Sequence, residues 1–357
     1  MDLHTLTDLE PFVCRPDASI RTVMERLNGF TKVVALPHPF LLVVDADGRL
    51  VGTITDGDIR RALLRNVALD GSAGAVMHGN PITGRIGAEI ENRVRLRDVA
   101  IDDPFLPLID DSGVLRAVLV SMGWRDALGS ALVMAGGFGK RLGSRTENTP
   151  KPLLEVGGRP ILEHILARLE AAGVGRIFVA VHYLHKQIEQ FVACRRSIAD
   201  VSIIHESNPL GTAGSIGAIP ADTGGNLLVI NADLLTDTNF RLLSDFHERR
   251  GYDATITVAT FEVRIPYGVV RHNADGLFAG IEEKPKQTAF VAAGIYVLSP
   301  QVVALVNPGA RLDMPDLLNR AHGIGLRIGV FPVHEYWRDV GQPGDLEAAE
   351  DDYRARS

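Results

Sequence analysis

The sequence has few of the residues that would indicate a disulfide-rich, membrane or nucleic-acid-binding protein. It contains two cysteines, Cys14 and Cys194, far apart and without CxxC spacing, so neither a disulfide framework nor a thiolate metal site is indicated. The formal net charge of -7 and the lack of a basic stripe argue against nucleic acid or an acidic membrane as a partner. No apolar run approaches the roughly 20 residues of a membrane span, and the first residues lack the pattern of a signal peptide. We therefore expect a soluble, cytoplasmic protein.

Two segments of the N-terminal part are similar to each other at a constant spacing. "LLVVDADGRLVGTITDGDIRRAL" (41–63) aligns with "LPLIDDSGVLRAVLVSMGWRDAL" (106–128), so that Asp45 matches Asp110 and Gly48 matches Gly113. Each copy predicts a strand, a turn, a second strand and a helix, and neither copy could bury its apolar face alone. The sequence therefore predicts two repeats, about 1–65 and 66–126, that pack on each other.

This N-terminal part, residues 1–126, resembles a tandem pair of CBS domains (a Bateman module), which bind adenine or related nucleotides between the repeats. In "GTITDGD", Thr55 and Asp58 match the threonine and aspartate that hold phosphate and ribose in such units. The second copy has Val120 and Gly123 at these places, so the resemblance implies one regulatory nucleotide site at most. The alternative is that the turn only caps the helix that follows, and the residues leave both interpretations open.

From Ser130 onward the pattern changes to alternating strands and helices. Such alternation indicates an α/β domain with a Rossmann-like, mostly parallel sheet that is covered on both faces. In such sheets the ligand lies beyond the carboxyl ends of the strands. Strands are predicted at 131–135, 176–181, 201–206, 226–233 and 253–260, and a helix at 160–173.

The most informative stretch is "LVMAGGFGKRLGSRTENTPKPLLEVGGRPIL" (132–162). It is neither a Walker loop, which needs GxxxxGKS or GxxxxGKT, nor a dinucleotide fingerprint, which needs GxGxxG. Gly136, Gly137 and Gly139 let backbone N–H groups approach a polyphosphate. Arg141 offers forked donors for a leaving pyrophosphate, and two prolines fix the direction of Lys151 toward the reacting phosphates.

The same string resembles the signature of the sugar-1-phosphate nucleotidyltransferases, and the resemblance implies a GT-A-like domain at residues 131–357. In that family the glycine loop and Arg141 would hold the nucleoside triphosphate, with Lys151 at the reaction centre. Two further segments occur in the family's order. "VINADLL" and "YWRDVGQPGD" carry Asp233 and Asp339 at the places of the family's magnesium ligands, and carboxylate oxygens suit Mg²⁺.

The resemblance also implies positions for the base and the sugar. "HESNPLGTAGS" places Glu206 and Gly211 near the nucleobase. "PYGVV", "IEEKP" and "AGIYVL" resemble the sugar-phosphate-binding segments. The residues implied there are Gly268, Glu283, Lys284 and Gly294.

One position departs from the family. Ala292 stands where the family often has asparagine before "AGIYVL", so a side-chain amide that could bond a sugar hydroxyl is missing there.

We predict nucleotidyl transfer from a nucleoside triphosphate to a sugar 1-phosphate with Mg²⁺ as cofactor. "PLGTAG" favours GTP and a glucosamine, heptose or mannose type of sugar, and the whole chain resembles bacterial glucosamine-1-phosphate guanylyltransferases of legionaminic acid synthesis. UTP or dTTP as donor stays open. A protein of another class, a catalytically weak nucleotide sensor, is the second hypothesis. A homodimer or higher homo-oligomer is expected, since paired CBS modules often dimerise.

Overall fold

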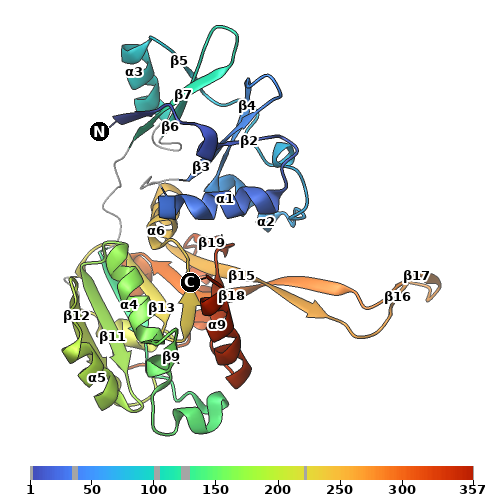
Figure 1. Cartoon of the computed structure of the whole chain (residues 1–357). Coiled ribbons are helices and arrows are strands. Elements are labelled where there is room, and N and C mark those ends of the chain that lie inside the picture. Colours follow the sequence, from blue (N-terminus) through green and yellow to red (C-terminus); the bar gives the residue numbers. More distant parts are fainter. Residues whose placement is uncertain (1–2, 34–38, 100–104, 122–128, 221–222, 357) are drawn as a thin grey trace. The chain divides into compact units, whose positions relative to one another are not determined.

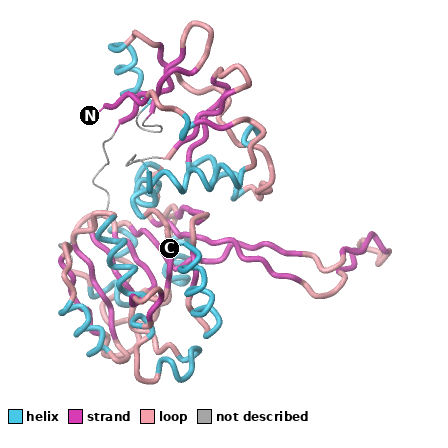
Figure 2. Tube along the Cα trace, in the orientation of Figure 1, coloured by secondary structure: helices cyan, strands magenta, loops and turns pink. Residues whose placement is uncertain are grey.

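The computed structural model describes residues 3–33, 39–99, 105–121, 129–220 and 223–356. It divides into two compact units, Met1–Gly129 with Asn239–Gly251, and Ser130–Thr238 with Tyr252–Ser357. Figures 1 and 2 show the elements of both. In the described part of the chain, every helix is too short or too polar to cross a membrane.

Two small sheets form the first unit, and each is built in the same way. In each repeat a short strand runs parallel to the first strand of an antiparallel hairpin. The first repeat contains η1 (Glu10–Phe12), β2 (Val13–Cys14), α1 (Ile20–Val33), β3 (Phe40–Val44), β4 (Leu50–Thr55) and α2 (Asp56–Leu64). The second contains η2 (Ala73–Ala75), β5 (Gly84–Arg85), α3 (Glu89–Val99), β6 (Phe105–Ile109) and β7 (Leu115–Ser121), to which β1 (Leu3–Leu6) is paired.

The hairpin turns of the two repeats have the same local structure. Asp45 Oδ1 accepts two backbone N–H groups of its own turn, and Asp110 Oδ1 does the same in the second repeat. Gly48 and Gly113 follow with φ of 77° and 82°, in the left-handed region that glycine tolerates best. The carbonyl of each of these glycines accepts a backbone bond from the other repeat. Equivalent residues therefore meet where the repeats join.

The core between the repeats has the same internal symmetry. The Phe40 and Phe105 rings, one from the first strand of each hairpin, stack with centroids 4.0 Å apart. Both belong to one buried cluster with residues of both repeats, including Ile54 and Val118. The prediction that the two copies pack on each other is confirmed. The helix expected after the second hairpin, and Gly123 within it, lie outside the described residues.

A seven-stranded sheet forms the second unit, in the order β12-β11-β8-β13-β18-β15-β19. Its strands are β8 (Ser130–Met134), β11 (Arg176–Val181), β12 (Asp200–His205), β13 (Leu227–Asn231), β15 (Ala254–Arg264), β18 (Lys286–Leu298) and β19 (Ile328–Val333). Only β18 runs antiparallel to its neighbours, so the mostly parallel, mixed sheet predicted from the alternation is confirmed.

Shorter elements connect the strands. The helices of the chain's second half are η3 (Lys140–Thr146), η4 (Lys151–Leu153), α4 (Ile161–Ala171), α5 (His185–Cys194), η5 (Gly214–Ala218), α6 (Phe240–Arg249), α7 (Pro300–Val303), α8 (Met314–Gly323) and α9 (Pro343–Arg356). The remaining strands are β9 (Glu155–Val156), β10 (Arg159–Pro160), β14 (Leu234–Thr236), β16 (Val269–His272), β17 (Phe278–Glu282) and β20 (Trp337–Asp339).

Both faces of the central strands are buried, which explains their continuous apolar sequence. In β8, for example, Leu132 belongs to a cluster with Met314 and Leu317 of α8, and Val133 on the opposite face is also fully buried. The helix predicted after Pro160 is α4, and its residues Ile161 and Leu162 are fully buried.

Beyond the sheet, β15 and β18 continue as a two-stranded hairpin that ends in the β16–β17 pair. Figure 1 shows this hairpin extending away from the sheet, and Figure 2 shows the same along the chain trace. The pairing runs from Val258 with Ala292 out to Arg264 with Lys286. No residue from Thr260 to Ala292 is buried. We refer to Thr260–Ala292 as the arm.

Candidate functional site

The site lies beyond the carboxyl ends of the parallel strands. The glycine loop follows β8, Glu206 follows β12, and Asp233 follows β13 by two residues. Because β12, β11, β8 and β13 are all parallel in register, these three segments come together at one edge of the sheet. The edge is the one at which the sequence predicts a ligand.

Lys151 is the buried cation of this site. Its side chain is 9% exposed, and Nζ lies 2.5 Å from Asp233 Oδ2 and 3.9 Å from Asp339 Oδ1. Pro150 in extended conformation precedes it, and Pro152 follows within the short η4 helix. Burial of a lysine is costly unless an anion lies beside it, and the two carboxylates are those anions here.

The two aspartates meet because β14 pairs antiparallel with β20. Leu234 is opposite Asp339 in this pair, and the Val340 N–H donates to the Asp233 carbonyl oxygen at 3.0 Å. Burial raises the pKa of Asp339, and the neighbouring charge of Asp233 raises it further, while Lys151 acts against both. Two carboxylates about a hundred residues apart in sequence thus form one negatively charged pair.

The donor atoms of this pair fit a hard divalent cation. Asp233 Oδ1 and Asp339 Oδ1 are both buried, and neither has a hydrogen-bond partner. Buried acceptors without a partner are costly, and carboxylate oxygens are ligands that Mg²⁺ prefers. Asp233 and Asp339 are therefore the residues that would hold such an ion.

Arg141 completes the charged group. A Cβ placed on Gly341 would lie 3.5 Å from Asp339 Oδ1 and 3.6 Å from Arg141 Nη2, which locates both side chains beside that glycine. The Arg141 charge also acts against the raised pKa of Asp339. The structure thus brings together all four residues predicted to be catalytic, namely Arg141, Lys151, Asp233 and Asp339.

The three glycines of the loop have different surroundings. Gly139 has a φ of 65°, and an added Cβ would lie 3.0 Å from Thr146 Cγ2 and 3.3 Å from Lys151 Cβ. At Gly136, an added Cβ would lie 3.2 Å from Glu206 Oε2. At Gly137 an added Cβ would meet nothing within 4 Å. The loop is thus packed at its ends and open at its middle.

Glu206 is a buried carboxylate with two partners in its own segment. Its Oε1 accepts from the Ser215 hydroxyl, and its Oε2 accepts from the Leu210 N–H at 3.2 Å. Ser215 is not among the site residues predicted from sequence, although it lies in the same "HESNPLGTAGS" block. Glu206 therefore fixes the loop that follows it and contacts the glycine loop through Gly136.

Gly211 lies on the far side of the same segment. It has a φ of 80°, and an added Cβ would lie 2.6 Å from both Asp313 Oδ1 and the Leu312 carbonyl oxygen. Thr212 donates its N–H to Asp313 Oδ1 at 3.0 Å and accepts from the Met314 N–H at 2.8 Å. These contacts explain the glycine by packing, and the predicted closeness of Gly211 to a nucleobase stays a prediction.

Gly294 and Ala292 lie on β18 beside the end of β13. Gly294 has a φ of 74°, and an added Cβ would lie 2.7 Å from Asn231 Nδ2. Asn231 is the last residue of β13 and precedes Asp233 by two residues. The predictions from sequence include the amide missing at Ala292 but not the amide of Asn231. The sequence feature that could have indicated Asn231 is its position as the polar residue that ends the apolar strand in "VINAD".

The three other residues predicted for the sugar phosphate lie on the arm. Gly268 and Glu283 are neighbours, since a Cβ on Gly268 would lie 2.8 Å from Glu283 Oε2. Lys284 has a φ of 48°, and its N–H donates to the Tyr267 carbonyl oxygen. Figure 1 shows the segments on either side of the β16–β17 pair out along the arm. The described structure brings these residues to one another but not to Lys151 and the aspartates.

In the first unit, Thr55 and Asp58 form a capping box at the start of α2. The Asp58 carboxylate accepts from the Thr55 N–H and hydroxyl at 2.8 Å, and it also pairs with Arg61. The capping interpretation of this turn is therefore confirmed, and its use for a nucleotide stays a prediction. A separate cavity of 550 Å³ near Cys14 and Arg26 does not include either residue in its lining.

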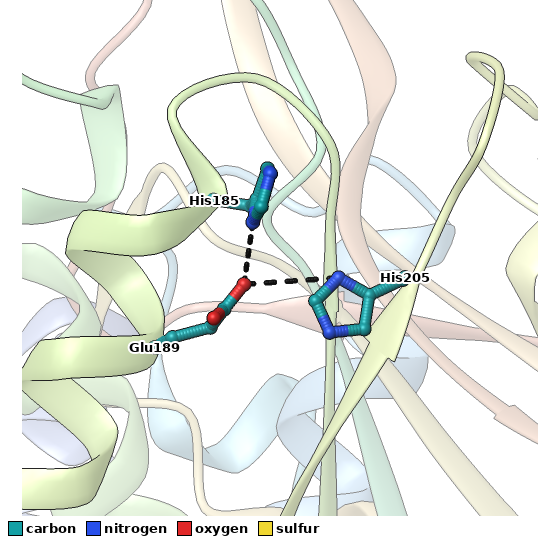
Figure 3. A group of neighbouring side chains, drawn as sticks. All are labelled: His185, Glu189 and His205. Carbon is teal, nitrogen blue, oxygen red and sulfur yellow. Dashed lines mark hydrogen bonds and ion pairs between the residues drawn. The ribbon is translucent and has the colours of Figure 1, made fainter.

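A second group of metal-type ligands lies on α5 and at the end of β12 (Figure 3). His185 Nδ1 lies 2.5 Å from Glu189 Oε1, and His205 Nδ1 lies 3.7 Å from the same oxygen. All three side chains are more than a third exposed, and none of them has a buried polar atom without a hydrogen-bond partner. Hydrogen bonding and charge account for this group without an ion.

Together, the sheet, the glycine loop after its first strand and the carboxylate pair at the strand ends define a Rossmann-like α/β domain with residue types that suit a polyphosphate at one edge of the sheet. Comparison with protein families gives the particular family. Residues 130–356 match the model described as nucleotidyl transferase, and the chain belongs to this family. Residues 6–65 match the CBS domain model.

Similar proteins agree with this family. The chain is 33% identical over 223 residues to a mannose-1-phosphate guanylyltransferase catalytic subunit beta of Drosophila pseudoobscura pseudoobscura, covering 60% of each chain. It is 34% identical over 228 residues to a mannose-1-phosphate guanyltransferase of Schizosaccharomyces pombe, covering 60% of this chain and 61% of that protein. The chain thus spans about 60% of the length of these relatives.

A solved structure shows the same fold. It comes from Bacillus anthracis, with a provisional assignment as a glucose-1-phosphate thymidylyltransferase in complex with a sucrose. The TM-score is 0.51 at 21% identity, covering 63% of this chain and 95% of that chain.

Proposed function

We propose that this chain transfers a nucleotidyl group from GTP to a sugar 1-phosphate of the mannose, glucosamine or heptose type. A phosphate oxygen of the sugar 1-phosphate forms a bond to the α-phosphorus of GTP. The bond from that phosphorus to the bridging oxygen breaks, and pyrophosphate leaves with the electron pair. The observation that carries the proposal is the group of Lys151, Arg141, Asp233 and Asp339 beside the glycine loop.

The chain's own residues supply positioning and charge. No protein nucleophile is needed, because phosphoryl chemistry of this kind depends mainly on alignment and charge neutralisation. Lys151 and Arg141 oppose the negative charge that moves to the leaving pyrophosphate. The open middle of the loop at Gly137 lets a phosphate approach backbone N–H groups.

We propose Mg²⁺ as the cofactor, held by Asp233 and Asp339. When bound, it supplies charge neutralisation and a template for the reacting phosphates. The two buried oxygens without a hydrogen-bond partner support this assignment. The competition between Lys151 and a cation for the Asp233 carboxylate follows from the 2.5 Å contact.

The choice of GTP rests on two supports. The segment "PLGTAG" resembles the guanylyltransferase branch, and the relatives reported above are named guanylyltransferases. The amide of Asn231, which lies beside Gly294, is our candidate for a sugar hydroxyl contact in place of the one missing at Ala292. Regulation by a nucleotide at Thr55 and Asp58, and assembly as a homo-oligomer, are further parts of the proposal.

The proposal is tested by Mg²⁺-dependent pyrophosphate release. GTP, UTP, dTTP, CTP and ATP are each combined with the 1-phosphates of mannose, glucosamine, glucose and a heptose. We expect a signal that requires GTP and one sugar of the named types. It should be lost in Asp233→Asn but not in the matched carboxylate variant Glu155→Gln, since Glu155 is the exposed residue of β9. A signal confined to UTP or dTTP refutes guanylyl transfer, and no signal from folded protein refutes the proposal.

A further inference from the structure

The arm exposes a large apolar surface to solvent. A two-stranded hairpin is only marginally stable by itself, and contiguous exposed apolar patches usually mark interaction surfaces. Seven large apolar side chains of the arm are 47% to 74% exposed. They are Phe261, Val263, Tyr267, Val270, Leu277, Phe278 and Ile281.

The inner half of the arm has one apolar face. Phe261 and Val263 point to the same side, since strand residues two apart share a face. The other side carries the ion pair of Lys286 with Glu262. Toward the sheet the apolar side continues into the buried cluster that contains Ala259 and Trp337, and Trp337 is two residues before Asp339. The apolar face of the arm is thus an extension of the packing beside the carboxylate pair.

The charge of the arm suits a partner that is itself acidic. The arm has four cationic side chains and four carboxylates, so its formal net charge is zero, whereas the formal net charge of the whole chain is -7. A neutral apolar ribbon can approach a second acidic chain without net repulsion, and it offers nothing to a nucleic acid. The cationic residues are Arg264, Arg271, Lys284 and Lys286, and the acidic ones are Glu262, Asp275, Glu282 and Glu283.

The arm also carries residues that its own site lacks. Glu283 and Lys284 are the pair expected at the sugar phosphate, yet they lie out on the arm without a described contact to Lys151 or Asp233. A second copy of this chain holds the matching carboxylate site. Resting on the proposed function, we propose that the arm crosses to a second copy of this chain, packs its apolar face there, and places Glu283 and Lys284 at the partner's site.

The area of such an exchange matches a stable dimer. From Thr260 to His272 the ribbon spans about 40 Å at about 3.3 Å per residue, and two strands are about 10 Å wide. One face is then about 400 Å², and each protomer buries its own arm and receives its partner's, or about 800 Å² per protomer. This is the size of a standard specific interface, and a two-fold axis makes the exchange closed.

Mass measurement tests the interface. The wild-type chain is expected to be a dimer by size-exclusion chromatography with light scattering, and the double variant Phe261→Lys, Ile281→Lys is expected to be a folded monomer by circular dichroism and mass. The matched control is Ile198→Lys, which changes an apolar side chain that is 89% exposed but lies off the arm. A wild-type monomer overturns the proposal, as does a dimer that the arm variant leaves intact. If the arm variant fails to fold, the wild-type mass and the complementation below decide.

Complementation tests the shared site. Lys284→Met and Asp233→Asn are each expected to lose turnover alone. When they are co-expressed, mixed dimers have one site that combines an intact arm with an intact carboxylate pair, so about a quarter of the wild-type activity returns if two-fold dimers mix at random. If mixed dimers form, as shown by two different affinity tags, and stay inactive, each arm serves its own chain and the proposal is wrong. An inactive wild type with an arm-dependent dimer refutes the proposed function while leaving the interface intact.

Discussion

In the proposed reaction Lys151 and Asp233 make opposite contributions, and variants of the two residues should separate these contributions. Lys151→Met keeps the length and apolar stem of the side chain and removes its charge. Asp233→Asn keeps the shape and removes a ligand charge. The Nζ of Lys151 lies 2.5 Å from Asp233 Oδ2, so each substitution also changes the surroundings of the other residue.

The magnitudes follow from burial and charge. Loss of one positioned charge at a developing negative charge costs about 3–4 kcal/mol of activation free energy, so turnover of Lys151→Met should fall roughly 100- to 1000-fold. Its unfolding free energy without Mg²⁺ should fall by roughly 1–3 kcal/mol, because the two carboxylates lose their shared counter-charge while the desolvation cost of the lysine is removed. Asp233→Asn leaves that lysine charge buried without its nearest anion and should lose about 2–4 kcal/mol, somewhat less than for a fully buried pair because Asp233 is 25% exposed.

The Mg²⁺ dependence is the decisive assay. Lys151 and a cation compete for the Asp233 carboxylate, so Lys151→Met should reach half-maximal activity at the same or lower Mg²⁺ concentration than wild type. Asp233→Asn should need at least tenfold more Mg²⁺ for whatever activity it keeps. Turnover is measured as pyrophosphate release across a Mg²⁺ titration, and folding by urea denaturation. The reasoning is refuted if Lys151→Met keeps more than about a tenth of the turnover, or if both variants raise the Mg²⁺ requirement equally.

Two further predictions concern the glycines and the acid stability of the fold. Gly211→Ala should lower the unfolding free energy by roughly 2–4 kcal/mol in urea denaturation, because an added Cβ meets backbone at positive φ. Gly137→Ala, the matched control, should leave stability unchanged and raise the KM for the nucleotide; an unchanged KM would contradict phosphate binding at that turn. Glu170→Gln should cost up to roughly 3 kcal/mol at pH 7, because the bond from Arg195 lowers the Glu170 pKa from 4.5 to about 2. A lowered pKa stabilises the fold above about pH 4.5, so the difference from wild type should shrink as the pH falls from 4.5 toward 2, and a pH-independent difference would contradict the assignment.

The sequence was sufficient for the order of elements, and the four residues that it predicts to be catalytic lie together in the structure. The repeat offset predicted that the two copies pack together, and Phe40 and Phe105 meet at that offset. The closeness of Asp233 and Asp339 came only from family resemblance, because it depends on the pairing of β14 with β20, and neither three-residue strand has a periodic pattern of its own. For Thr55 and Asp58 the sequence left two roles open, because a capping box and a ribose contact use the same residue types.

The arm was beyond sequence reasoning for a different reason. Alternating residues such as Phe261 and Val263 predict a strand with one buried face, but the pattern does not say which chain covers that face. The packing of Gly294 on Asn231 was missed as well, because the two residues are far apart in sequence and meet only where β18 pairs with β13.

The three glycines of the loop after β8 have three different surroundings, and this division links the fold to the proposed reaction. Gly136 admits the buried Glu206 carboxylate, which ties the loop to the segment after β12. Gly139 adopts a positive φ against Lys151, which sets the direction of the buried cation toward Asp233. Both ends of the loop are thus held by side chains of the site, and only Gly137 faces open space. A backbone fixed at two points and open between them is preorganised for a phosphate, because the N–H groups there need little rearrangement when an anion arrives.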